Sequence, residues 1–152
     1  MTYDDLLKEA DQEGLIVKEK PLRANDGRIK NKKIAIRRDL TTTAEKACVL
    51  AEELGHHYTS TGSILDQSDV LSRRQELLAR LWGYERLIGM AGLIKCFEAG
   101  CRSRYEAAEL LGVTEEYLMD ALAAYKQRYG LCRQYGEYMI CFEPLMIIKQ
   151  IT

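Results

Sequence analysis

The sequence predicts an α+β protein that is mostly helical and carries a small antiparallel sheet near its N-terminus. Long stretches place apolar residues at helical spacing, whereas residues 28–30 and 33–37 alternate apolar and charged side chains. A turn signal, Asn25-Asp26-Gly27, precedes the first of these alternating runs. The chain has 152 residues, of which 47% are hydrophobic, so it can bury a substantial core.

Composition limits the classes of partner. Lys and Arg number 22 against 23 Asp and Glu, a formal net charge of -1, so no global field attracts nucleic acid or membrane and any such contact must be local. The longest apolar run is too short for a membrane span and the N-terminus is polar, so we expect a cytoplasmic protein without a membrane partner. We expect reduced, buried thiols, because the cysteines are odd in number and lie mostly in apolar patterns. They are Cys48, Cys96, Cys101, Cys132 and Cys141.

The N-terminal elements follow from periodicity and turn residues. A helix is expected over residues 3–13, with Gly14 ending it, and a strand over residues 15–20 that Pro21 limits to an edge. A hairpin around Asn31 completes a sheet of about three strands. The basic run of this sheet could bind an acidic or nucleic-acid partner, but the favoured interpretation is a solvated edge whose charge prevents aggregation. The run consists of Lys30, Lys32, Lys33, Arg37 and Arg38.

A central helix is predicted from about Thr43 to residue 59. Thr42 and Glu45 have the spacing of a capping box at its start. Gly55 lies inside the helix although it costs about 1 kcal/mol relative to Ala, which suggests that another element crosses closely there. A polar loop that includes residues 61–68 follows. A long amphipathic helix is expected next, with Ser72 as its N-cap, an irregularity at Gly89 or Gly92 and its end near Phe97.

The C-terminal third has the form of a helix-turn-helix. The phrase A-x-x-L-G-V-T at residues 108–114 places a glycine at a turn and a threonine as the next N-cap. The second helix begins with Glu115-Glu116, the wrong charge for a phosphate-lined groove, so a structural helical pair is favoured over DNA binding. A terminal β-hairpin is expected over residues 131–143, and Pro144 ends it. We divide the chain into domains at residues 1–100 and 101–152, with the second packing on the first.

The candidate chemistry lies on the central helix. Glu52 and His56 are separated by four residues, so their side chains share a face and can bind one ion. Glu53 is rotated about 100° further and can reach a water molecule on that ion without binding the ion itself. Glu76, on the next helix, can supply a third ligand, leaving a fourth position for water as a catalytic zinc site requires.

Other interpretations of these residues remain open. Glu53 and His57 are also four residues apart and could bind metal in a shifted register, with His57 as the alternative ligand. Without metal, His56 and His57 would be cations favoured at a helix C-terminus, and Glu76 would pair with Arg80 one turn later.

Two phrases carry a resemblance to a known family. Residues 50–58 read L-A-E-E-L-G-H-H-Y, and Glu76, Ala79 and Trp82 form E-x-x-A-x-x-W. These resemble the L-A-H-E-L-G-H-H-Y helix and the E-x-x-A-x-x-F/W phrase of ImmA/IrrE metallopeptidases, which occur in bacteria, phages and mobile genetic elements. The resemblance covers roughly residues 1–125. Glu52 stands where the family has its first histidine ligand.

The resemblance implies a zincin-like metallopeptidase domain and a cytosolic zinc endopeptidase that cleaves or antagonises a helix-turn-helix repressor. Glu53 would be the general base, and Glu52, His56 and Glu76 would hold zinc. A second anionic ligand would reduce the Lewis acidity of the ion. The alternative hypothesis is therefore an inactive protein of the same fold that regulates a repressor by binding alone.

Overall fold

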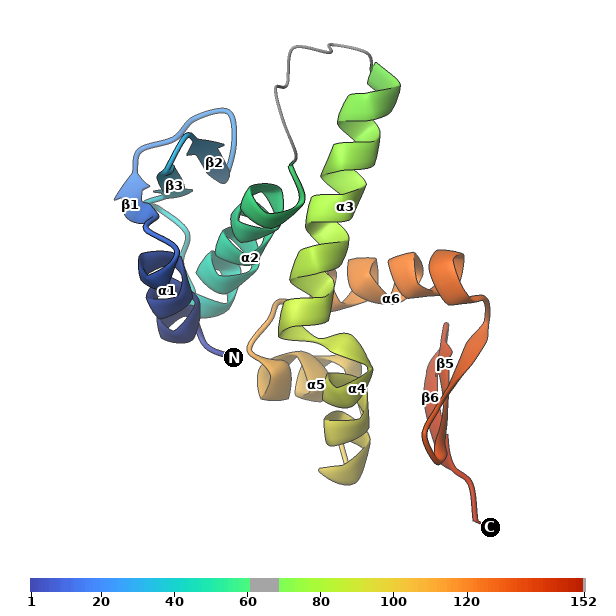
Figure 1. Cartoon of the computed structure of the whole chain (residues 1–152). Coiled ribbons are helices and arrows are strands. Elements are labelled where there is room, and N and C mark those ends of the chain that lie inside the picture. Colours follow the sequence, from blue (N-terminus) through green and yellow to red (C-terminus); the bar gives the residue numbers. More distant parts are fainter. Residues whose placement is uncertain (61–68, 152) are drawn as a thin grey trace. The chain divides into compact units, whose positions relative to one another are not determined.

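The computed structural model describes residues 1–60 and 69–151 and confirms the α+β class (Figure 1). The chain forms two compact units, Met1–Leu87 and Ile88–Thr152. Within the second unit, α4 (Gly89–Glu98) contacts α5 (Arg104–Leu111), and the domain boundary after residue 100 stays a prediction. The loop expected at residues 61–68 lies outside the described residues. No described helix has the length and apolar character that a bilayer span needs.

The N-terminal unit joins a small sheet to three helices. Its elements are α1 (Tyr3–Gln12), β1 (Ile16–Lys20), β2 (Gly27–Lys30), β3 (Lys33–Arg37), α2 (Thr43–Thr59) and α3 (Asp69–Leu87). In Figure 1, α2 lies between the sheet and α3, and it contacts α1, α3, β2 and β3. The helix predicted to carry the site is thus the centre of this unit.

The N-terminal sheet is mixed, whereas a purely antiparallel sheet was expected. Its strand order is β1-β3-β2, with β2 antiparallel to β3 across the turn at Asn31, whose φ is 56°. β1 pairs with the other side of β3 in parallel. Parallel neighbours need a crossover, and here β2 itself lies within the connection from β1 to β3.

The start and inner face of α2 follow the prediction closely. The Thr42 hydroxyl accepts a hydrogen bond from the Glu45 amide at 3.1 Å. The Glu45 carboxylate accepts from the hydroxyls of Thr41 and Thr42 instead of the cap amide, so only half of the predicted capping box forms. The predicted apolar stripe is buried and consists of Ala47, Leu50, Ala51 and Leu54.

The close helix crossing predicted from Gly55 is confirmed. A Cβ added at Gly55 would lie 2.9 Å from the carbonyl carbon of Ala79 and 3.0 Å from its Cα, so α3 crosses α2 at backbone contact. The helix containing Ala79 starts earlier than expected, at Asp69, and Ser72 therefore lies inside α3 and is not its N-cap.

The C-terminal unit contains the predicted helical pair, followed by a sheet with one more strand than expected. Its elements are α4, α5, α6 (Glu115–Tyr129), β4 (Cys132–Tyr135), β5 (Tyr138–Phe142) and β6 (Leu145–Lys149). Ser103 and Thr114 cap α5 and α6, and Gly112 has the positive φ of 72° that the turn between them requires. The predicted hairpin is part of a three-stranded antiparallel meander, because the apolar residues after Pro144 form β6.

One cysteine pair contradicts the expectation of uniformly reduced thiols. Cys132 on β4 lies directly opposite Cys141 on β5, and the two form a disulfide. Cys48, Cys96 and Cys101 are not part of a disulfide. The pairing depends on strand register, which the sequence spacing of the cysteines did not reveal.

Candidate metal centre

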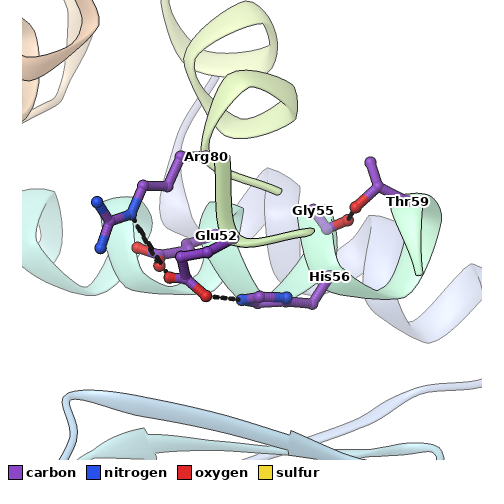
Figure 2. Close-up of polar contacts among 6 residues, drawn as sticks. Glu52, Gly55, His56, Thr59 and Arg80 are labelled. Atoms are coloured by element: carbon purple, nitrogen blue, oxygen red, sulfur yellow. Dashed lines mark hydrogen bonds and ion pairs between the residues drawn. The ribbon is translucent and has the colours of Figure 1, made fainter. Parts of the chain in front are cut away.

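The structure brings together the three residues that the sequence predicts as ligands. Glu52 and His56 lie one turn apart on the same side of α2 (Figure 2). His56 Nε2 is 3.2 Å from Oε2 of Glu76, which lies on α3. One potential ligand atom from each of the three residues lies within 4.8 Å of the others. Among the described residues, this is the one group of three or more His, Cys, Asp or Glu side chains that could hold a metal ion.

Backbone contact between two helices sets this geometry. Gly55 precedes His56 on α2, and Ala79 follows Glu76 by three residues on α3, so the crossing point lies beside the cluster. At the end of α2, the Thr59 hydroxyl donates a 2.7 Å hydrogen bond to the Gly55 carbonyl (Figure 2). The close approach of Gly55 to Ala79 therefore keeps His56 and Glu76 near each other.

Glu53 lies beside the cluster and is the only buried charged side chain among the described residues, with 8% exposure. Burial, followed by the charges of Glu52 and Glu76, raises the pKa of Glu53 to about 7. The first residue of β2 passes close to it, since a Cβ at Gly27 would lie 2.9 Å from Glu53 Oε1. Sequence reasoning identified Gly27 only as a turn residue and missed this packing role.

Arg80 supplies a positive charge to the cluster. Its Nε lies 3.5 Å from Glu52 Oε1 and 3.5 Å from Glu76 Oε1. Burial and a hydrogen bond with Glu76 raise the pKa of Glu52, whereas that same hydrogen bond, together with His56 and Arg80, lowers the pKa of Glu76. Of the two carboxyl groups, Glu52 therefore has the higher pKa.

The pairing of Arg80 with Glu76 was among the predicted alternatives, but its contact with Glu52 was not. The first pairing is within one helix and follows from spacing alone. The second joins two helices and depends on how closely they cross, so no sequence signal could have revealed it.

His57 lies apart from the three-residue cluster. Its Nε2 is 3.4 Å from Glu13 Oε2, and its ring packs edge-on against Tyr58. Tyr58 in turn stacks on Trp82 of α3, with ring centroids 4.9 Å apart. The residues that would form the shifted register, Glu53 and His57, are therefore directed to different neighbours.

The cluster opens into a cleft of about 770 Å³ between α2, α3 and the β2 edge of the sheet. Glu52, Glu53, His56 and Glu76 line its helical wall. The opposite wall comes from the start of β2 and its flanking turns. It contains Asn25, Asp26, Gly27, Arg28, Ile29 and Asn31.

The donor set fits a divalent metal ion. One imidazole nitrogen and two carboxylate oxygens are ligands that zinc accepts, and they leave a fourth tetrahedral position open. Ligand atoms of a tetrahedral zinc lie about 3.4 Å apart, so the present spacing of up to 4.8 Å needs only a small closure. For an ion to bind both carboxylates, the Arg80 guanidinium would have to move away from them.

The fold and this cluster together define an α+β protein in which two crossing helices present a histidine and two glutamates to a cleft beside a sheet edge. In comparisons with known proteins, no family model, no curated protein and no solved structure matches this chain.

Proposed function

We propose that this protein is a zinc-dependent endopeptidase that inactivates a helix-turn-helix repressor in the cytoplasm. The observation that carries the proposal is the convergence of Glu52, His56 and Glu76 within 4.8 Å, with the buried Glu53 beside them. The choice of a helix-turn-helix repressor as substrate, and the connection to phages and mobile elements, rest on the resemblance to ImmA/IrrE metallopeptidases.

The residues of the site have distinct roles in this proposal. Glu52, His56 and Glu76 hold the ion, which activates water and polarises the scissile carbonyl when bound. Glu53 accepts a proton from the attacking water and delivers it to the leaving amine. Its burial suits this task, because a desolvated carboxylate is a stronger base than an exposed one.

The sheet edge gives the cleft a means to hold an extended peptide. β2 is the edge strand next to the cluster, and Gly27 brings its backbone against Glu53. An edge strand can pair with the main chain of a ligand regardless of its side chains. A substrate strand aligned on β2 would pass across the cluster with its carbonyl groups near the proposed general base.

A second candidate function is regulation by binding without proteolysis. Arg80 favours it, because its contacts with Glu52 and Glu76 neutralise the carboxylates without a metal ion. The same cleft and sheet edge would then bind the repressor and leave it intact.

Incubation with a purified helix-turn-helix repressor, in the presence of zinc, tests both candidates. The peptidase proposal predicts cleavage at a defined site by mass spectrometry, its loss with a chelator, and its loss in Glu53→Gln. Glu85→Gln, an exposed change on α3, is the matched control and retains cleavage. Equal cleavage by Glu53→Gln would contradict the peptidase proposal. Repressor inhibition without cleavage, unchanged in Glu53→Gln, would establish the second candidate.

A further inference from the structure

The N-terminal sheet concentrates positive charge that the chain as a whole does not have. Residues 15–38 contain nine Lys and Arg and two acidic residues, a local charge of +7 in a chain of net charge -1. Strand alternation directs six of these cations to the face of the sheet away from the buried Ile34 and Ile36. Arg37 is one of them, and it forms ion pairs with Asp26 and Asp39, which leaves five cations without an ion pair among the described residues. The surface that these five form, called the basic face below, consists of Lys18, Lys20, Arg28, Lys30 and Lys33.

The register of the strands brings these cations close to one another. Lys18 of β1 and Arg28 of β2 flank Ala35 of β3 on opposite sides, and Lys30 lies directly opposite Lys33. The five side chains surround a shallow cleft of about 370 Å³ with Ile16, Leu22 and Ala35 on its floor. The cations thus form a two-dimensional array across three strands and are not confined to one sheet edge.

Among the described residues, no carboxylate forms an ion pair with the five cations of the basic face. Of the two acidic residues of the segment, Glu19 pairs with Lys46 at 2.6 Å and Asp26 pairs with Arg37 at 3.2 Å. Like charges directly opposite on adjacent strands, such as Lys30 and Lys33, are destabilising, so the fold gains nothing from this arrangement.

We propose that the basic face binds the phosphate backbone of duplex DNA without sequence specificity. Residues two apart along a strand are about 7 Å apart, and adjacent strands are about 5 Å apart, so the cations form a dense grid. Duplex DNA carries one negative charge per about 1.7 Å of its axis, which is enough to engage the whole grid at once. The aliphatic floor has no aromatic ring for stacking unpaired bases or anchoring in a lipid interface, which favours a duplex backbone over both.

DNA binding by the basic face would bring the protein close to a DNA-bound repressor, but the DNA-binding proposal does not depend on the proposed peptidase function. Arg28 lines both the basic face and the cleft beside the metal centre. A repressor bound to its operator would therefore be presented next to the cleft when the basic face contacts the flanking DNA.

Fluorescence anisotropy with a labelled duplex of random sequence, titrated at salt concentrations from 50 to 200 mM, tests the proposal. Four or five phosphate contacts predict a slope of log K against log salt of about -4. In the full chain, Lys18→Gln/Lys30→Gln should weaken binding about ten-fold and make the slope less steep by about 2. Lys8→Gln/Lys95→Gln, which changes the net charge equally at exposed sites outside the sheet, is the matched control and should bind as the wild type does.

The two double variants should have the melting temperature of the wild type, so that a loss of binding reports the surface and not the fold. Equal weakening by both double variants would overturn the proposal, because binding would then follow net charge alone. Tighter binding of poly-glutamate than of the duplex, at equal charge and equal salt, would also overturn it and assign the face to acidic proteins. Binding to phosphatidylserine vesicles but not to the duplex would assign it to membranes. Each readout is independent of peptidase activity.

Discussion

Glu52 and Arg80 determine the charge of the candidate metal centre. The cluster contains two carboxylates and one imidazole, and the charges of the two carboxylates would cancel that of a divalent cation. Arg80 lies 3.5 Å from each carboxylate and offsets part of their negative charge. A bound metal ion would therefore compete with Arg80 for the same carboxylates.

Replacing Arg80 with methionine should strengthen metal binding. A unit charge about 4 Å away is worth about 1 kcal/mol in water-like surroundings, so Arg80→Met should lower the Kd for zinc about five-fold. Methionine retains much of the packing of the arginine stem. Isothermal titration of the metal-free proteins measures the difference. An unchanged or higher Kd would show that Arg80 does not compete with the ion.

At the residue scale, the sequence predicted the members of the cluster but not its electrostatics. Helical periodicity places Glu52 and His56 on one face, and the family phrase led to Glu76. The contact between Arg80 and Glu52 and the burial of Glu53 against Gly27 depend on the distance between separate elements. No local pattern reports that distance.

At the element scale, the α2–α3 crossing positions the site. The crossing is tight because Gly55 has no side chain where it meets the backbone of Ala79. The sequence revealed this crossing, since a glycine inside a well-capped helix needs a packing reason. It did not reveal the parallel β1–β3 pair or strand β6, because strand partners are chosen by long-range packing that periodicity within one segment does not encode.

Gly55→Ala should force α3 away from α2. The added Cβ would overlap the backbone of Ala79, which cannot rotate aside, so the cost of overpacking should exceed the gain in helix propensity. We expect a net loss of about 1–2 kcal/mol in the free energy of unfolding, measured by urea denaturation, and weaker zinc binding as Glu76 moves from His56.

Gly92→Ala on α4 provides the matched control for this change. There an added Cβ would meet only the Cδ2 atom of Leu111, at 3.1 Å, and that side chain can turn away. Its zinc affinity should equal that of the wild type. Equal stability and zinc affinity in Gly55→Ala and Gly92→Ala would contradict the role assigned to the helix crossing.

At the scale of the whole molecule, the two units differ in their covalent constraints. The Cys132–Cys141 disulfide closes a loop in the second unit, whereas the cysteine of the first unit, Cys48, forms no disulfide. Under denaturing conditions without reductant, a thiol assay should count three thiols per chain, and five after reduction. Five thiols before reduction would show that the pair is reduced in the purified protein.

Removal of the disulfide should destabilise the second unit. For a sequence separation of 9 residues, the loss of loop-closure entropy predicts a decrease of about 2–3 kcal/mol in the free energy of unfolding. Cys132→Ser/Cys141→Ser tests this by chemical denaturation, and zinc binding by the first unit should be unaffected. A double variant as stable as the oxidised wild type would contradict the expected constraint.

The central claim is that Glu52, His56 and Glu76 form a binding site for one divalent metal ion. Zinc titration into the metal-free protein, followed by isothermal calorimetry and elemental analysis, tests it most directly. We predict one ion per chain, with binding lost in His56→Ala and Glu76→Ala and retained in His57→Ala, since His57 contacts Glu13 outside the cluster. No stoichiometric zinc in the wild type, or equal zinc in His56→Ala and the wild type, would contradict the claim.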